Sequence, residues 1–259
     1  MSEWDGTGQA YAVSFAQLTA GAVAPLLDAV GARVAGGAFL DVGAGSGVLT
    51  DAARARGYDV RATEPEASMR AVLRAAHPDL EVAAAAVPHL PYDDGSFDVV
   101  AANFVVNHVA DPRASVRELA RVTRAGGVVA VTIWPTGASP LRPVWEAMAG
   151  AAGAPPLANA LPPEHDFPRT EEGLAALLAA ASLTDVQTTR PAWMWEVAPG
   201  VLWHAVEGGI ATIGNLYRRV DPAAQERMRA AFERETGARV EASGLLALPH
   251  DAILAIGTR

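Results

Sequence analysis

The chain contains 259 residues, of which 51% are hydrophobic, and it carries a formal net charge of −9 with no cysteine. This hydrophobic content can bury a sizeable core, so we expect one large α/β domain with additions. The absence of cysteine excludes disulfides and thiolate metal sites. The negative charge argues against a nucleic-acid or anionic-membrane partner, because binding to phosphates needs a basic surface.

The sequence also predicts a cytoplasmic protein. It contains no uncharged apolar run of about 18 residues, the length that indicates a transmembrane helix. Residues 1–5 lack the basic start and apolar block of a signal peptide. All basic residues are arginine and alanine is abundant, which indicates a GC-rich bacterial genome.

Short apolar segments alternate with helical patterns through the first half of the chain. The predicted strands are 38–42, 58–63, 80–84, 97–102 and 128–134. The predicted helices are 49–56, 66–76 and a helix that opens at Asp111-Pro112 and stops before Gly126-Gly127. This alternation predicts parallel βαβ units with right-handed crossovers.

The second half is less regular and richer in helices. We expect helices over 140–150, 170–181, 199–220 and 222–236, an extended segment over 184–196, and a closing strand over 249–257. Thr170 is the expected N-cap of the second of these helices. The helical segments are expected to fold over the carboxyl edge of the sheet, where ligands bind in open α/β sheets.

A glycine-rich turn after the first predicted strand is the most informative feature. Residues 39–50 read Phe-Leu-Asp-Val-Gly-Ala-Gly-Ser-Gly-Val-Leu-Thr, with Asp41 inside the strand end. Glycine permits positive φ and close approach of the backbone to a ligand, and the following helix aims its N-terminus at the same place. Glu64 follows the second strand, where an acid can accept hydrogen bonds from both ribose hydroxyls. The pattern therefore predicts a nucleoside-cofactor site.

The spacing of the glycines does not fit a dinucleotide. A GxGxxG fingerprint would need glycine at Val48 or at Thr50. The pattern Asp-x-Gly-x-Gly-x-Gly resembles motif I of class I S-adenosylmethionine-dependent methyltransferases instead. Three further runs, 90–100, 103–112 and 117–127, are similar to the branch of this family that contains ubiquinone/menaquinone-biosynthesis and natural-product methyltransferases. The resemblance covers about residues 36–134.

The resemblance implies a Rossmann-like, mostly parallel seven-stranded sheet with an antiparallel last strand and a helical lid. We expect one domain, with its core at about 30–134, 170–196 and 248–259 and its lid at about 1–25, 136–169 and 197–247. It also implies S-adenosyl-L-methionine as cofactor, with S-adenosyl-L-homocysteine as product. The residues implied to bind it are Asp41, Gly43, Ala44, Gly45, Gly47, Glu64, Pro65, Met69, Ala86, Val87, Asn103, Phe104, Tyr11 and Phe15. An aspartate that often binds the adenine amino group is Ala86 here, so the adenine contacts are expected to be weaker or arranged differently.

His108 is the candidate general base, because it lies shortly after Asn103 at the carboxyl end of the fourth strand. Packing in the loop before Asp111 is an equal alternative for this side chain. The candidate substrate contacts are Trp134, Trp145, Trp203, His204 and Glu207. The tryptophans could pack in the core or line a pocket for an aromatic or cationic substrate. His77, His89, His165 and His250 are expected at the surface, and no spacing predicts a metal site.

The predicted function is methyl transfer from S-adenosylmethionine to an O, N or C atom of a small metabolite, in secondary or cofactor metabolism. We expect a monomer or homodimer. Two other readings stay open at this point, because a fold does not determine a function. One is a cyclase or isomerase that uses the cofactor on the same scaffold, and the other is a non-catalytic methyltransferase-like subunit. A nicotinamide dehydrogenase is disfavoured by Val48.

Overall fold

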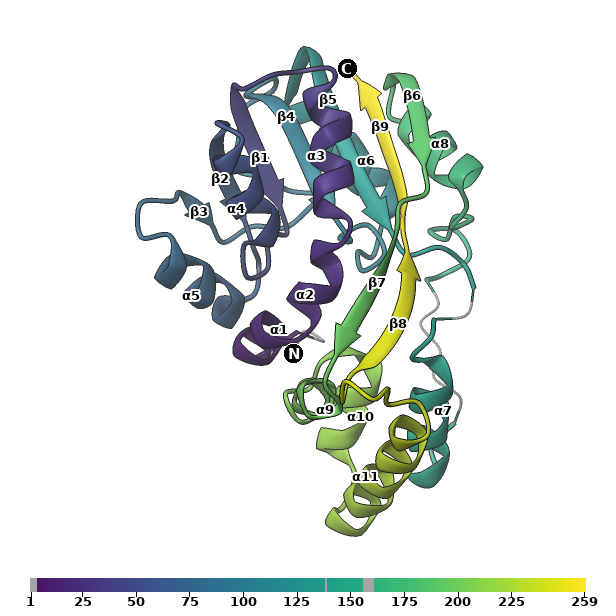
Figure 1. Cartoon of the computed structure of the whole chain (residues 1–259). Coiled ribbons are helices and arrows are strands. Elements are labelled where there is room, and N and C mark those ends of the chain that lie inside the picture. The colour runs from purple at the N-terminus through teal and green to yellow at the C-terminus, as the bar shows by residue number, and fades with distance from the viewer. Residues whose placement is uncertain (1–3, 138, 156–160) are drawn as a thin grey trace.

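The computed structural model describes residues 4–137, 139–155 and 161–259. Its main sheet has seven strands in the order β3-β2-β1-β4-β5-β9-β6 (Figure 1). The strands are β1 Ala38–Val42, β2 Asp59–Thr63, β3 Val82–Ala83, β4 Phe97–Asn103, β5 Thr123–Ile133, β6 Thr184–Thr189 and β9 Ile253–Thr258. Strands β1 to β5 pair in parallel, whereas β9 pairs antiparallel with both β5 and β6. The predicted fold class, a mostly parallel sheet with an antiparallel last strand, is confirmed.

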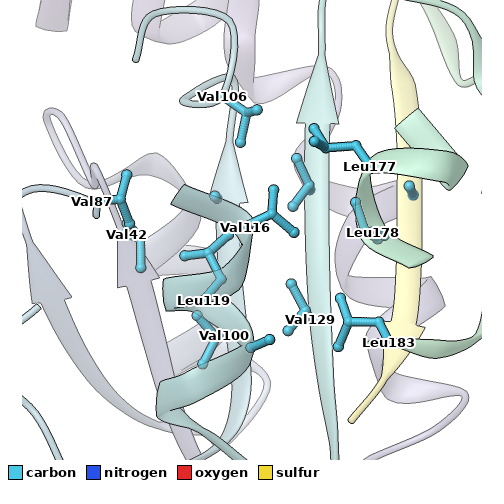
Figure 2. Close-up of a cluster of buried hydrophobic side chains, with 14 of the residues drawn as sticks. Val42, Val87, Val100, Val106, Val116, Leu119, Val129, Leu177, Leu178 and Leu183 are labelled. Atoms are coloured by element: carbon cyan, nitrogen blue, oxygen red, sulfur yellow. The ribbon is translucent and has the colours of Figure 1, made fainter. Parts of the chain in front are cut away.

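Helices cover both faces of this sheet, as the two-residue period of the strands requires. Val100 of β4 and Val129 of β5 point to the face covered by α6 (Pro112–Val122) and α8 (Glu171–Ala179), where they meet Leu119 and Leu178 (Figure 2). Their neighbours along the strands point to the opposite face, which α3 (Val23–Gly31) and α4 (Val48–Ala55) cover. Helix α5 (Ala67–Ala76) packs beside the short edge strand β3 through Leu73.

Capping side chains set the helix starts that the sequence predicts. The Asp111 carboxylate accepts a hydrogen bond from the Ala114 N–H at 2.9 Å, and Pro112 occupies the first turn of α6. The Thr170 hydroxyl accepts one from the Gly173 N–H at 3.1 Å at the start of α8. Both predicted starts are confirmed.

Several predicted boundaries were wrong, because tertiary contacts override the local pattern. Helix α6 ends at Val122 rather than at the glycine pair, because β5 already begins at Thr123 beside β4. The expected strand 80–84 shortens to β3. The segment 184–196 divides into β6 and β7 (Ala192–Val197), and 199–220 divides into α9 (Pro199–Glu207) and α10 (Ala211–Arg219).

A second, two-stranded sheet leaves the main sheet at its carboxyl edge. It pairs β7 with β8 (Leu246–Asp251) in antiparallel register, and in Figure 1 it reaches down to a group of helices. These are α9, α10, α11 (Pro222–Gly237) and α7 (Arg142–Ala151), packed around their own core of Met148, Leu202 and Phe232. The expected strand 249–257 is thus two strands, β8 and β9, which break at Ala252 and serve different sheets.

The N-terminal helices α1 (Gly8–Val13) and α2 (Phe15–Ala20) lie between the main sheet and the group of lid helices (Figure 1). Helix α1 contacts both α5 and α9. Residues 1–3, 138 and 156–160 of the predicted lid segments lie outside the described residues. Among the helices of the described chain, none has the length and apolar character needed to cross a membrane.

Candidate active site

The turn between β1 and α4 is built by glycines in left-handed conformations. Gly45 has φ +56° and Gly47 has φ +102°, values that residues with a Cβ rarely adopt. A Cβ on Gly47 would stand 2.5 Å from Leu73 Cδ1, so α5 packs directly on this part of the turn. The N–H groups of Gly43 and Ala44 donate to the Thr63 carbonyl at 2.8 and 3.0 Å, which ties the turn to the end of β2.

Glu64 stands beside this turn and is held by the backbone. Its Oε2 accepts a hydrogen bond from the Gly45 N–H and its Oε1 one from the Glu66 N–H, both at 2.9 Å. Burial raises the pKa of Glu64, although these two hydrogen bonds oppose the shift. A carboxylate has about four acceptor positions, so two remain for a ligand. The residues present fit a ribose diol at this place.

Asp41 lies behind the turn rather than in front of it. Its side chain is buried and its Oδ2 accepts a hydrogen bond from the Thr50 hydroxyl at 2.7 Å. Burial raises the pKa of Asp41 to about 7, and the nearby charge of Glu64 acts in the same direction. This carboxyl group supports the glycine turn from below, and it does not line the cavity described next.

A cavity of about 790 Å³ runs along the carboxyl edge of the main sheet. Sites for small molecules and cofactors have volumes of about 300–1,000 Å³. Most of the residues predicted to bind the cofactor line this cavity: Gly43, Gly45, Glu64, Pro65, Met69, Ala86, Val87, Asn103, Phe104, Tyr11 and Phe15. Asp41, Ala44 and Gly47 of that prediction lie outside its lining.

The N-terminal helices close the cavity over Glu64. Tyr11 approaches Gly45, since a Cβ on that glycine would stand 3.4 Å from Tyr11 Cε1. Burial raises the pKa of Tyr11, and the charges of Glu64 and Asp41 raise it further. Trp4 packs edge-on against Tyr11, with ring centroids 6.0 Å apart. Together these contacts place an aromatic cover above the predicted ribose position.

Asn103 and Phe104, at the carboxyl end of β4, line the cavity and are held by hydrogen bonds and ring packing. Asn103 accepts a hydrogen bond from the Thr132 hydroxyl at 2.6 Å, and its amide donates to the Thr19 carbonyl at 3.4 Å. Phe104 has φ +58°, a conformation that costs about 1–3 kcal/mol for such a residue. Its ring stacks on Trp134 at 3.9 Å between centroids. The backbone strain turns this ring toward the far half of the cavity.

His108 lines the cavity, as its candidate role requires. Its ring is open to the cavity on one side and packs edge-on against Trp4 on another, at 5.4 Å between centroids. His108 is exposed along the cavity, and desolvation by the surrounding protein lowers its pKa to about 4, with a contribution from the positive charge of Arg169. The imidazole is therefore neutral at pH 7 and can accept a proton only weakly.

Two predicted substrate contacts, Trp134 and Trp145, line the far half of the cavity, and three do not. Trp203 is buried in the core of the lid helices against Tyr217 and Phe232. His204 and Glu207 are exposed. They lie three residues apart on α9, whose buried residues face inward, and both remain in solvent. The structure therefore places these three predicted residues outside the lining of this cavity.

His250 was expected at the surface and is instead buried in the wall of the cavity, with 8% of its surface exposed. Arg190 and Asp251, which form an ion pair, line the cavity beside it. The sequence carries no motif for them, since β8 reaches the site only because it leaves the main sheet with β7. The alternation of Leu246, Leu248 and His250 at every second position is the sequence signal that could have indicated an inward histidine on β8.

Among the described residues, no group of three or more His, Cys, Asp or Glu side chains could hold a metal ion.

Comparisons with known proteins agree with this geometry. Residues 40–131 match the family model described as a methyltransferase domain. The YcgJ protein from Bacillus subtilis shares the fold, with a TM-score of 0.58 and 18% identity over 92% of this chain and 97% of that chain. Phosphoethanolamine N-methyltransferase 2 from Haemonchus contortus, solved with S-adenosylhomocysteine, gives a TM-score of 0.54 and 15% identity over 91% of this chain and 52% of that one.

The family match identifies residues 40–131 as similar to a methyltransferase domain, and the fold and the glycine turn with Glu64 agree with the class of this domain that uses S-adenosylmethionine. Within that class the domain is similar to demethylmenaquinone methyltransferases. The protein of that name from Renibacterium salmoninarum is 37% identical over 106 residues, which are 41% of this chain and 44% of the relative. An uncharacterized methyltransferase from Mycobacterium tuberculosis is 40% identical over 111 residues, 43% of each chain. The chain thus spans less than half the length of these curated relatives.

Proposed function

We propose that this protein transfers a methyl group from S-adenosylmethionine to a small-molecule acceptor. The observation that carries the proposal is Glu64, whose two oxygens are held by the N–H groups of Gly45 and Glu66 at one end of a single long cavity. The far end of the same cavity is aromatic and lies under the lid. A nucleoside end and an acceptor end in one enclosure are what methyl transfer between two bound molecules requires.

The bound cofactor would supply an activated methyl group on a sulfonium, so the protein needs to align the acceptor and exclude water. Glu64 would accept hydrogen bonds from the ribose hydroxyls. The glycines of the turn carry no side chains, so the cofactor could approach the protein backbone there. Met69 and Val87 would pack beside the adenine. Phe104 and Trp134 would hold the acceptor against the carboxyl end of β4. Trp4 and Tyr11 would close the site on the N-terminal side.

The acceptor is a small metabolite with a reactive O, N or C atom, and the relatives' names make a quinone-like molecule one candidate. A place in natural-product or cofactor biosynthesis and a cytoplasmic location are parts of this proposal. A monomer or homodimer is the expected assembly.

Binding of S-adenosylmethionine, S-adenosylhomocysteine and NADH, measured by calorimetry on the purified chain, tests the cofactor half of the proposal. We expect micromolar binding of the first two and none of NADH. Glu64→Ala should weaken S-adenosylhomocysteine binding by about ten- to a hundredfold, the loss of charged hydrogen bonds. Glu226→Ala, on the exposed side of α11, is the matched control and should bind normally. Equal affinities for wild type and Glu64→Ala would refute the assignment of Glu64.

The mass of the reaction product separates methyl transfer from the other functions open to this fold. Incubation with S-adenosylmethionine and a metabolite extract should yield a product heavier by one CH₂ unit. A product of unchanged mass would indicate a cyclase or isomerase. Cofactor binding with no product from any extract would favour a non-catalytic subunit.

A further inference from the structure

His250 occupies a position in the cavity wall that the proposed function has not yet used. Its ring lies among three tryptophans, with centroid distances of 6.0 Å to Trp134, 6.2 Å to Trp193 and 5.9 Å to Trp195. The ring is nearly parallel to Trp193, at 24°. Of these tryptophans, Trp134 also lines the cavity. The imidazole is therefore packed among aromatic rings in the wall of the cavity, at the end where we place the acceptor.

A backbone contact determines which ring nitrogen of His250 carries the proton. Nδ1 lies 3.0 Å from the Leu248 carbonyl oxygen. A carbonyl oxygen can only accept, so Nδ1 must donate and Nε2 of the neutral ring keeps its lone pair. Within the described ranges, 4–137, 139–155 and 161–259, no side chain or backbone group bonds to Nε2. This nitrogen is a hydrogen-bond acceptor without a protein donor.

We propose that His250 is a catalytic residue: Nε2 accepts the hydrogen bond of a hydroxyl group on a planar, uncharged acceptor and takes its proton during methyl transfer. The inference rests on the proposed function, which it deepens by naming the base and the kind of acceptor group. As the hydroxyl O–H bond breaks, the proton goes to Nε2 and the oxygen forms a bond to the methyl carbon. The electron pair of the broken carbon–sulfur bond stays on the sulfur.

The surroundings favour a planar and uncharged acceptor. Phe104 and Trp134 stack at 19° to each other, which presents flat aromatic surface at the same end of the cavity. Arg190 and Asp251, which line the cavity with His250, neutralise each other in an ion pair. A charged group on the acceptor molecule would therefore have no unpaired counter-charge at either of these two residues.

His250 is also better placed than His108 to receive a proton. Desolvation lowers the pKa of His108 to about 4, and the positive charge of Arg169 acts in the same direction. Burial lowers the pKa of His250 too, but the Leu248 carbonyl and the Asp251 carboxylate oppose that shift. These two groups would stabilise the imidazolium that forms when Nε2 takes the proton. The His250 ring is thus neutral before the reaction, and these two groups stabilise its protonated form after the proton transfer.

Two planar probes that differ by one hydroxyl group test the proposal without knowledge of the natural acceptor. 2-Naphthol and naphthalene would be titrated into protein saturated with S-adenosylhomocysteine, with tryptophan fluorescence as the signal. We expect wild type to bind 2-naphthol about fivefold more tightly than naphthalene, the effect of one hydrogen bond. His250→Phe keeps an aromatic ring and should remove this preference while naphthalene binding is retained. His89→Phe makes the same change at an exposed position outside the cavity and should behave as wild type.

Nitrogen-15 spectra of the wild-type histidine rings give a second measurement that does not depend on a variant folding. The His250 signals should show a protonated Nδ1 and an unprotonated Nε2, and Nε2 should shift when 2-naphthol is added. A protonated Nε2 in the free protein, no binding of 2-naphthol, or an equal hydroxyl preference in His250→Phe would each overturn the proposal. If the wild-type protein does not bind S-adenosylhomocysteine, the proposed function is contradicted instead. Failure of the His250 proposal and failure of the proposed function can therefore be distinguished.

Discussion

Replacement of Asp41 by asparagine should change how the stability of the unliganded protein depends on pH. The Asp41 side chain is 1% exposed and accepts a hydrogen bond from the Thr50 hydroxyl at 2.7 Å. Burial raises the pKa of this carboxyl group from 3.8 to about 7 in the folded state. The folded state therefore prefers the protonated form, which asparagine resembles in shape and charge.

The size of the effect follows from the linkage between protonation and folding. Each pKa unit corresponds to about 1.36 kcal/mol, so the full shift of Asp41 is worth about 4 kcal/mol. Because the pKa of Asp41 is higher in the folded state than in the unfolded chain, protonation of Asp41 favours the folded state. This contribution to the free energy of unfolding is fully present at pH values below the pKa of the unfolded chain. It is lost progressively as pH rises to about 7. Between pH 5 and pH 8, Asp41→Asn should gain about 3 kcal/mol relative to wild type.

Urea unfolding followed by circular dichroism, at four pH values from 5 to 8, measures this change. The amide's unpaired N–H groups carry a cost of about 1–3 kcal/mol that does not depend on pH, so the slope of the difference is the decisive quantity. Asp59→Asn, at an exposed position on β2, controls for the loss of one negative charge. A difference between Asp41→Asn and wild type that stays constant across this pH range would refute the reasoning.

Three other measurements test local features. The ring protons of His108 should not titrate in NMR spectra between pH 5.5 and 8, because its pKa is about 4; a midpoint near the ordinary value of about 6.5 would contradict the desolvation of this ring by the surrounding protein. Gly47→Ala should lower the free energy of unfolding in urea by about 1–3 kcal/mol, because φ is +102° and a Cβ would stand 2.5 Å from Leu73 Cδ1. Gly150→Ala, in α7 with open space at its Cβ, should raise stability by up to about 1 kcal/mol, so loss of stability in both variants would count against the conformational argument. Thr170→Ala should cost about 1 kcal/mol in the same assay through the lost cap of α8, and an unchanged midpoint would show that the cap contributes nothing.

The cofactor half of the site was predictable because it is local in sequence. The turn, its glycines and Glu64 lie within one βαβ unit, and the parallel register that sets Asp41 beside Ala62 brings strand ends together automatically. Eleven of the fourteen predicted cofactor residues line the cavity. The other three, Asp41, Ala44 and Gly47, belong to the strand end and the turn but lie outside the lining, and sequence spacing cannot distinguish a supporting residue from a lining one.

The acceptor half was not predictable from pattern. Trp134 lines the cavity whereas Trp203 fills the lid core, although both are tryptophans in apolar segments. Their burial is decided by which element packs against them. His250 looked like a surface residue beside Pro249, and it became a wall residue because β8 pairs with β7 outside the main sheet.

The sequence by itself determined the alternation of strands and helices, the caps at Asp111 and Thr170, and the glycine turn with its acid, because hydrophobic period, capping chemistry and positive φ act over a few residues. Tertiary structure alone decided that β8 and β9 separate at Ala252 into different sheets. It also decided that the Leu248 carbonyl orients His250, and that Arg190 meets Asp251. These contacts join segments whose distance depends on the packing of the whole chain, which no local pattern records.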